Sequence, residues 1–410
     1  MKNFKQLYLI SFYIITLITF VFGGSIQFLL GVSNTILTFF LTGLLFFVYM
    51  LYAVFRQKVV FNRIAITAII YIGVVLGTAV LRQSPIVLTL TYLIFPLLPL
   101  GVYLFSYINY KENYISHKKI LKIFYQIALF QLPIMLVQKY FFSFLIQFNN
   151  SGQTIEWFDF MFGSFFIKSD HSLGVFLLLI IAIILFRENS VKGIIRFPKL
   201  ALLYLVATLF LTESNISKLF VVILISTFVI IPIYKKYKGT LIFKISVLAL
   251  TGSIILAGYS LREKQFIQNK LGGTLERQFS LESAQKFYEL GTAKRFQIIL
   301  VAAKKIETKY LGDGPYSYFD IRTGKFTQTR HFTQLIWTYY DLGLLGLLIV
   351  LSYIVFLTRY LKIERGIPYI FGLGLFLIYA VYTTILSDIA IMFTLVTLFN
   401  RKTITNKTTT

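Results

Sequence analysis

A long stretch without charge is the feature that most limits what this chain can fold into. From Gln6 to Phe55 there is no Asp, Glu, Lys or Arg, and most side chains are apolar. A helix needs about 20 predominantly apolar residues to cross a bilayer, so this stretch is long enough for two crossings. Similar runs fill most of the chain, in which 57% of the residues are hydrophobic and 14% are charged. A closed barrel would show short strands of alternating polarity, so the sequence predicts an all-α polytopic membrane protein.

About 12 transmembrane helices fit the apolar runs. They are 7–23, 35–55, 64–81, 86–106, 123–141, 172–186, 200–212, 219–234, 240–259, 333–357, 367–386 and 389–400. The first run lacks a small-residue cleavage site before a polar domain, so we interpret it as a retained helix and not as a signal peptide. The expected organisation is helices 1–9 in residues 1–259, one long extracytoplasmic loop in 260–332, helices 10–12 in 333–400 and a tail in 401–410.

Lys and Arg are distributed unevenly among the connections between these helices. With the N-terminus inside, the cytoplasmic segments hold 22 of the 40 basic residues. The short outer connections hold or adjoin four, namely Arg82, Lys139, Lys168 and Lys218. Short loops rich in Lys and Arg stay on the cytoplasmic side, so we expect both termini in the cytoplasm and the loop 260–332 outside.

The net charge of +24 does not indicate a nucleic-acid-binding protein. The cytoplasmic charges are scattered beside the apolar runs, which suits contact with anionic membrane lipids, whereas a nucleic-acid site would gather them on one folded face. The chain has no Cys, which excludes disulfides, thiolate metal sites and a Cys nucleophile.

The long outer loop contains one basic residue in a distinctive setting. Its thirteen Lys and Arg residues and seven acidic residues are mostly typical of a solvated surface. Arg295, however, opens a segment whose apolar residues recur at helical spacing, namely Phe296, Ile299, Leu300, Ala303 and Ile306. The pattern predicts an amphipathic helix on the membrane or on the helix bundle, which would hold Arg295 where its guanidinium can bind phosphate bidentately.

Two further features follow this helix in the loop. The segment LGDGPYSYF contains Gly312, Gly314 and Pro315, which predict a tight turn; it lacks the Lys of a phosphate-binding P-loop, and the role of Asp313 stays open. Arg330 and His331 come directly before the tenth apolar run. An imidazole beside an Arg at a membrane surface is a candidate catalytic base, although a lone His is more often structural.

Three other polar residues lie near the apolar runs. His171, in KSDHSLG, heads the sixth run and fits a helix start. Lys218, in the turn LTESNISKLF, fits a side chain that extends to the membrane interface. His117 lies in a cytoplasmic basic loop, and the sequence indicates no function for it.

The order of these features resembles the O-antigen and capsular polysaccharide polymerase and O-antigen ligase family. The resemblance covers mainly 200–357 and rests on LTESNISK, KRFQIILVAAKKI, LGDGPYSYF and HFTQLIWTYYDLGLLG. By position, Arg295 and His331 match the Arg and the His of that family, and Lys218 falls near its basic position after the Ser. The sequence departs from the family pattern in having Phe332 after the His and Asn215 after the Ser.

The resemblance implies a metal-independent glycosyltransferase of the bacterial cytoplasmic (inner) membrane. Such an enzyme takes a glycan from a polyprenyl diphosphate at the outer leaflet and joins it to a hydroxyl of another lipid-linked repeat unit. The implied product is O-antigen, capsule or exopolysaccharide, and the implied partners are a flippase and a chain-length regulator. No cofactor is implied.

The chemistry of the residues fits that reaction. Nucleotide sugars are absent outside the cytoplasmic membrane, so a transferase there needs a donor that is already activated. Arg295 and Arg330 could stabilise the charge that develops on a leaving diphosphate. A neutral His331, with an ordinary pKa of about 6.5, could accept the proton of the attacking hydroxyl. We therefore predict His331 as catalytic, and Arg295, Arg330, Lys218, His171 and Asp313 as substrate-binding; no outer loop shows a metal-ligand spacing.

Other functions remain open at this point. A polysaccharide flippase or transporter also has about a dozen helices, but it typically shows paired repeats and charges inside the spans. Here the spans are almost free of charge, apart from Lys244 and Asp341. A glycosyltransferase with a large first outer loop is disfavoured because the loop 24–34 is short and uncharged. An O-antigen ligase would differ from the polymerase only in its acceptor.

The charge distribution makes a prediction about topology. A reporter that is active only outside the cytoplasm should be active when fused after Tyr288, in the long loop, and inactive when fused after Lys236. The opposite pattern would invert the orientation and place the loop in the cytoplasm.

Overall fold

The computed structural model describes residues 2–157, 160–167, 170–186, 191, 193–212, 214–237, 240, 280–289, 300, 310–317, 334–360, 374–380 and 383–399. Over these residues the regular structure is helical and no strand occurs. Six helices are long and apolar enough to cross a membrane, namely Asn3–Leu30, Asn34–Arg56, Arg63–Leu81, Ile86–Glu112, His117–Tyr140 and Gln334–Arg359. The expected all-helical fold is thus confirmed over the described residues, and the six long apolar helices are compatible with a membrane protein. The count of twelve stays a prediction, and the ninth run at 240–259 and the amphipathic helix at Arg295 lie outside the described residues.

The helices follow the apolar runs closely and are often capped by side chains. Ser33 caps α3 through Ile36 N, Asn62 caps α4 through Ile64 N and Ala65 N, and Ser116 caps α7 through Lys119 N. The elements are α1 (Lys2–Leu17), η1 (Ile18–Phe22), α2 (Gly23–Leu30), α3 (Asn34–Arg56), α4 (Arg63–Leu81), α5 (Ile86–Tyr92), α6 (Ile94–Glu112), α7 (His117–Tyr140), α8 (Phe142–Leu145), η2 (Ile146–Phe148), α9 (Asp170–Phe186), α11 (Pro198–Leu211), α12 (Asn215–Tyr237), α16 (Leu281–Glu289), α19 (Gln334–Tyr360) and α21 (Ile389–Leu398).

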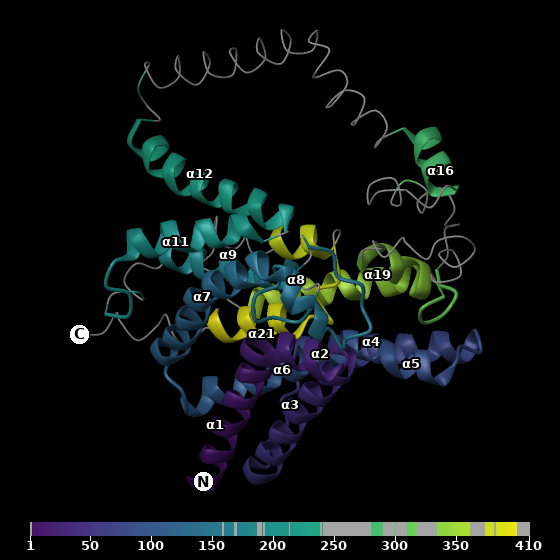
Figure 1. Ribbon diagram of the computed structural model, residues 1–410. Coiled ribbons are helices and arrows are strands. Elements are labelled where there is room, and N and C mark those ends of the chain that lie inside the picture. The colour runs from purple at the N-terminus through teal and green to yellow at the C-terminus, as the bar shows by residue number, and fades with distance from the viewer. Residues whose placement is uncertain are drawn as a thin grey trace.

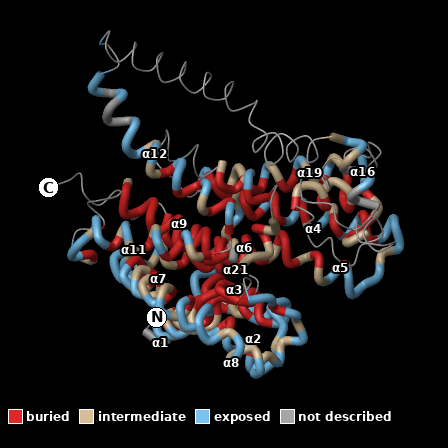
Figure 2. The backbone as a smooth tube through the Cα atoms, turned by 45° about the horizontal axis from the view of Figure 1, so that its top comes forward, coloured by how far each residue is buried: buried red, intermediate tan, exposed pale blue. Residues whose placement is uncertain are grey.

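Two apolar helices form the centre of the bundle. α21 packs against α6 on one side and α9 on the other, while α7, α11 and α12 pack around α9, and α4 packs against α6 and α19 (Figure 1). Every residue of α21 and nearly every residue of α9 is buried (Figure 2). A helix that is apolar on all sides is a core helix, so α9 and α21 are enclosed by the others.

α21 is too short to cross a bilayer alone. Its ten residues rise about 15 Å, about half the hydrocarbon thickness. The C-terminal end of α21 is held by His117, whose Nε2 lies 2.8 Å from the backbone oxygen of Leu398. His117, for which the sequence indicated no function, thus satisfies a carbonyl at a helix end.

A non-helical segment enters the bundle between α8 and α9. Phe160, Phe165 and Ile167 are buried although the chain here forms only turns. Side-chain amides supply the missing hydrogen bonds: Gln138 bonds both the N–H and the C=O of Gly163, at 2.9 and 2.8 Å. Further amide bonds join Gln131 Oε1 to Ser164 N at 3.0 Å and Gln27 Oε1 to Ile167 N at 2.9 Å. Gly24 allows the close approach, because a Cβ there would overlap the backbone oxygen of Phe165.

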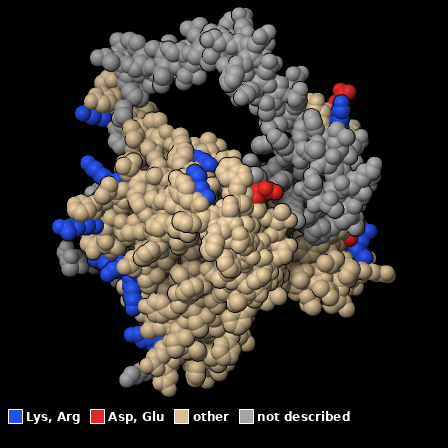
Figure 3. Space-filling view, in the orientation of Figure 1, with Lys and Arg blue, Asp and Glu red and all other residues tan. Residues whose placement is uncertain are grey.

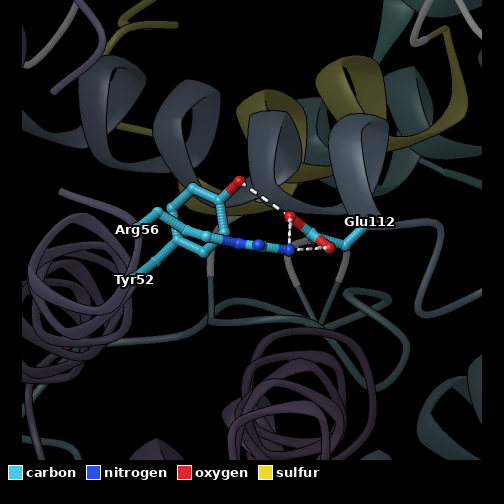
Figure 4. Close-up of polar contacts among 3 residues, drawn as sticks. All are labelled: Tyr52, Arg56 and Glu112. Atoms are coloured by element: carbon cyan, nitrogen blue, oxygen red, sulfur yellow. Dashed lines mark hydrogen bonds and ion pairs between the residues drawn. The ribbon is translucent and has the colours of Figure 1, made fainter. Parts of the chain in front are cut away.

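Charged residues lie mainly at the periphery. Arg56 at the end of α3 donates to both carboxylate oxygens of Glu112 at the end of α6, each at 2.7 Å, and Tyr52 donates to the same carboxylate at 3.0 Å (Figure 4). On the face shown in Figure 3, many of the Lys and Arg side chains lie along the left edge, a few charged side chains lie nearer the middle, and most of the coloured surface is uncharged. This agrees with the uneven distribution of charge in the sequence, although the orientation itself stays a prediction.

Candidate functional site

A chain of hydrogen bonds joins the starts of α9 and α12. His171 Nδ1 lies 3.0 Å from Ser214 Oγ, and Ser214 Oγ lies 2.6 Å from Ser217 Oγ. The Ser217 hydroxyl is in turn bonded to the hydroxyl of Tyr379, which belongs to the helical segment 374–380. Ser214, Ser217 and Tyr379 are fully buried, whereas His171 is partly exposed. The imidazole is therefore the accessible end of a buried network of hydroxyl groups, which we call the hydroxyl network.

The local sequence explains why these serines stand where they do. α11 ends at Leu211, and the turn that follows leads directly into α12. Ser214 precedes α12, and its Oγ accepts a long bond of 3.4 Å from Ser217 N, as a helix-capping Ser does. The cap places its hydroxyl at the positive end of the α12 dipole.

A carboxylate lies one residue further along α9. Ser172, next to His171, donates its hydroxyl hydrogen bond to Asp388 Oδ2. Asp388 caps α21, because its other oxygen accepts from Ile391 N at 2.9 Å. Burial raises the pKa of the Asp388 carboxyl, and the hydrogen bond from Ser172 opposes that rise. The starts of α9, α12 and α21 thus meet in one polar region.

Gln334, the first residue of α19, connects this region to a fourth helix start. Its Oε1 accepts from Ile385 N at 2.9 Å and from Leu386 N at 3.1 Å, and it is fully buried. The eleventh helix was expected to run to residue 386, but residues 383–388 are not helical, and Gln334 takes the place of their missing helical partners. The side-chain nitrogen of Gln334 is buried without a hydrogen-bond partner among the described residues.

The turn at 310–317 docks into a break in α19. Asp313 N donates to Tyr340 O at 3.1 Å, and Gly314 N donates to Asp341 O at 2.8 Å. Gly343 has a φ of 73°, and a Cβ at this position would overlap the backbone oxygen of Tyr310. The Asp341 carboxylate, inside the apolar helix, accepts from Ser317 Oγ at 3.1 Å. The predicted turn is therefore present, and it packs against a transmembrane-length helix.

Asp313 is bound at this turn and not in the hydroxyl network. Its carboxylate lies 3.8 Å from Arg82 Nη2, and Arg82 Nε donates to Gly312 O at 2.9 Å. Both Arg82 and Asp313 were expected on the outer side, so their contact is consistent with the predicted topology. The substrate-binding role predicted for Asp313 stays a prediction, although the geometry gives this residue a structural contact.

The other predicted residues fall into two groups. Lys218 follows Ser217 directly, and its Nζ lies 3.5 Å from Asn215 Oδ1, so it stands beside the hydroxyl network with His171. Arg295, Arg330 and His331 lie outside the described residues. Within the described part of the chain, no group of three or more His, Asp or Glu side chains could hold a metal ion.

Several residues of the site were not predicted from the sequence. They are Ser172, Ser214, Ser217, Gln334, Tyr379 and Asp388. Only LTESNISK was recognised as a distinctive turn, and the remaining residues are single polar side chains in apolar surroundings. Ser387–Asp388 before an apolar run is a capping signal that could have been found.

No family model matches this chain, and no curated protein or solved structure shows significant similarity to it. The resemblance to polysaccharide polymerases therefore rests on the sequence features alone.

The hydroxyl network depends on close contact between α9 and α12. A Cβ on Gly174 would overlap Ser217 Oγ and come within 3.0 Å of Ser214 Cβ. Gly174→Ala should therefore destabilise the protein by about 1–3 kcal/mol, as overpacking does, and lower the melting temperature in detergent. Gly43→Ala is the control, because nothing lies within 4 Å of its added Cβ and the change should be neutral or stabilise α3 by about 0.5–1 kcal/mol. Equal melting temperatures for the two variants would contradict the tight contact.

Proposed function

We propose that the protein polymerises polyprenyl-diphosphate-linked oligosaccharide repeat units on the outer face of a bacterial cytoplasmic membrane. The observation that carries the proposal is the meeting of His171, Ser214 and Ser217 with the starts of α12, α19 and α21. This is a polar, partly accessible region within an apolar bundle, and it adjoins the helix that His331 directly precedes in sequence.

The arrangement suits an anionic, lipid-linked donor. Helix N-termini carry partial positive charge and unsatisfied N–H groups, so they attract phosphate. A series of hydrogen bonds joins the start of α12 to the start of α19. Ser217 is bonded to the hydroxyl of Tyr379, and Thr383 N donates to the backbone oxygen of Tyr379 at 2.6 Å. Gln334 N, at the start of α19, donates to Thr383 O at 3.4 Å. Lys218, which is partly exposed at the start of α12, adds a cation for the oxygens of a diphosphate.

The reaction is a displacement at the anomeric carbon of the donor glycan. The bond between that carbon and the diphosphate oxygen breaks, and a new bond forms to a hydroxyl oxygen of the acceptor repeat unit. In the proposal, His331 takes the hydroxyl proton, and Arg295 and Arg330 stabilise the charge on the polyprenyl diphosphate that leaves. Neither a metal ion nor a cofactor is required for this step.

A second His is close to the site, which makes the base assignment testable. His171 has an accessible imidazole, but its Nδ1 is engaged with Ser214, and it fits a residue that orders the hydroxyl network. His331 is therefore proposed as the base and His171 as a positioning residue. An O-antigen ligase would use the same donor chemistry and differ only in the acceptor.

The proposal is tested by sizing the surface glycan of a deletion strain. Loss of the protein should leave glycan of one repeat unit, and the wild-type gene should restore long chains. No surface glycan at all would favour a flippase, and long lipid-linked chains not joined to their final acceptor would favour a ligase.

Variants introduced into the same strain test the base. His331→Ala should lower polymerisation roughly 10²- to 10⁴-fold at normal protein level, because that is the usual contribution of general base catalysis. His171→Ala should keep a larger share of the activity. If His171→Ala abolished polymerisation while His331→Ala had no effect, the base would be His171. Full activity in both variants would mean that no side-chain base is used.

A further inference from the structure

A cavity of about 180 Å³ lies among the described helices. Its walls come from the first turn of α3, the junction of α5 and α6, the docked turn at 310–317, the start of α19 and Ser387. Ser387 directly precedes Asp388, whose carboxylate accepts from Ser172, so the chain links the cavity wall to the polar region. The volume is several times the roughly 30 Å³ share of one water molecule in the liquid, which leaves room for a small ring.

One part of the wall offers neutral hydrogen-bonding groups. Asn34 and Thr35 are exposed at the start of α3, and Ser387 is partly exposed. Asn34 Oδ1 accepts from Thr38 Oγ1 at 3.0 Å, which orients the amide. The bond uses the amide oxygen, so the NH₂ group remains as a donor. Among the described residues that line the cavity, no side chain is a carboxylate, an amine or a guanidinium. These residues therefore offer no partner to a charged ligand group.

Another part of the wall is aromatic and rigid. Phe95 and Trp337 meet edge to face with their ring centroids 5.2 Å apart, and Tyr316 meets Trp337 in the same way at 6.5 Å. Tyr316 is also held by Tyr92 at 5.0 Å. Burial raises the pKa of Tyr316 to about 12, and the nearby charge of Asp341 adds to the rise, so the hydroxyl stays protonated at neutral pH. These contacts fix the rings before any ligand binds.

We propose that this cavity binds one neutral sugar residue of the glycan substrate, an inference that rests on the proposed function. A pyranose ring presents C–H groups that pack on aromatic rings and hydroxyl groups that pair with amides and hydroxyls, which matches both parts of the wall. A lipid chain would leave Asn34, Thr35 and Ser387 without partners, and an anionic sugar or phosphate would find no cation among the described lining residues. Because Ser387 in the cavity wall directly precedes Asp388, the wall continues along the chain into the polar region where α9 and α21 begin.

Trp337 provides a direct probe of the cavity. The chain has two Trp residues, and Trp157 is 59% exposed whereas Trp337 is 8% exposed in the cavity wall. Trp157→Phe therefore makes Trp337 the single fluorescent reporter in the purified, full-length protein in nanodiscs. Methyl glycosides of glucose, galactose, rhamnose and N-acetylglucosamine should be titrated one at a time, with glycerol and glucuronic acid as controls.

At least one neutral glycoside should give a saturable change in Trp337 fluorescence with a dissociation constant in about the millimolar range, as expected for a ring with few contacts. Asn34→Leu and Ser387→Val should each weaken that binding at least fivefold at an unchanged melting temperature. The matched control Gln147→Ala, an exposed residue outside the cavity, should bind like the parent. No saturable response to any neutral glycoside, or equal binding by glucuronic acid, would overturn the proposal.

The assay separates this inference from the proposed function. If the purified protein bound a glycoside saturably but the deletion strain made surface glycan of normal length, the polymerase proposal would be refuted and the neutral sugar site would stand. Normal polymerisation together with absent binding in the single-Trp protein would refute the sugar site alone.

Discussion

Every backbone N–H and C=O that enters an apolar interior needs a hydrogen-bond partner, and the structure is organised around that requirement. Helices meet it internally, but three described parts of the chain inside the bundle are not helical, namely 155–157 with 160–167, 310–317 and 383–388. Each is satisfied by polar groups of another element. Gln131 and Gln138 hold the first, the backbone of Tyr340 and Asp341 holds the second, and Gln334 holds the third. Irregular backbone is tolerated at such depth only where protein replaces water in this way.

The candidate site is a consequence of the same arrangement. The chain leaves helical geometry before α9, α12 and α21, so the free N–H groups and capping side chains of these helices gather in one region. Ser214 and Asp388 both cap helices. Ser214 also places its hydroxyl beside His171, and Asp388 places its carboxylate beside Ser172. In an otherwise apolar bundle, a region of this kind is where a charged diphosphate and a sugar hydroxyl could be desolvated without losing all partners.

The fold class was predictable because apolar runs report directly on helices. The run at 35–55 corresponds to α3 (Asn34–Arg56), and the run at 64–81 corresponds to α4 (Arg63–Leu81). The eleventh run was less predictable. At its end, the backbone N–H groups of Ile385 and Leu386 donate to the side-chain oxygen of Gln334 in place of helical carbonyls. Gln334 lies about fifty residues earlier in the chain, and composition does not indicate such a contact.

The site was predictable only in part for a similar reason. His171 and Lys218 stood out because His is rare and because LTESNISK interrupts two apolar runs. Their partner Tyr379 did not, because a Tyr in an apolar helix is ordinary, and its bond to Ser217 spans 162 residues of sequence. Gln131 and Gln138 were equally inconspicuous, since an isolated Gln in an apolar run has no periodic signature until its partner segment is known.

The most direct measurement is polymerisation by the purified protein. The chain would be reconstituted in lipid vesicles with a synthetic polyprenyl-diphosphate-linked repeat unit, in the presence of a chelator, and the products sized by mass spectrometry. The account predicts glycans longer by whole repeat units, with polyprenyl diphosphate released in step and no loss of rate on removal of divalent cations. Unchanged substrate, or elongation that ceases without a divalent cation, would contradict it.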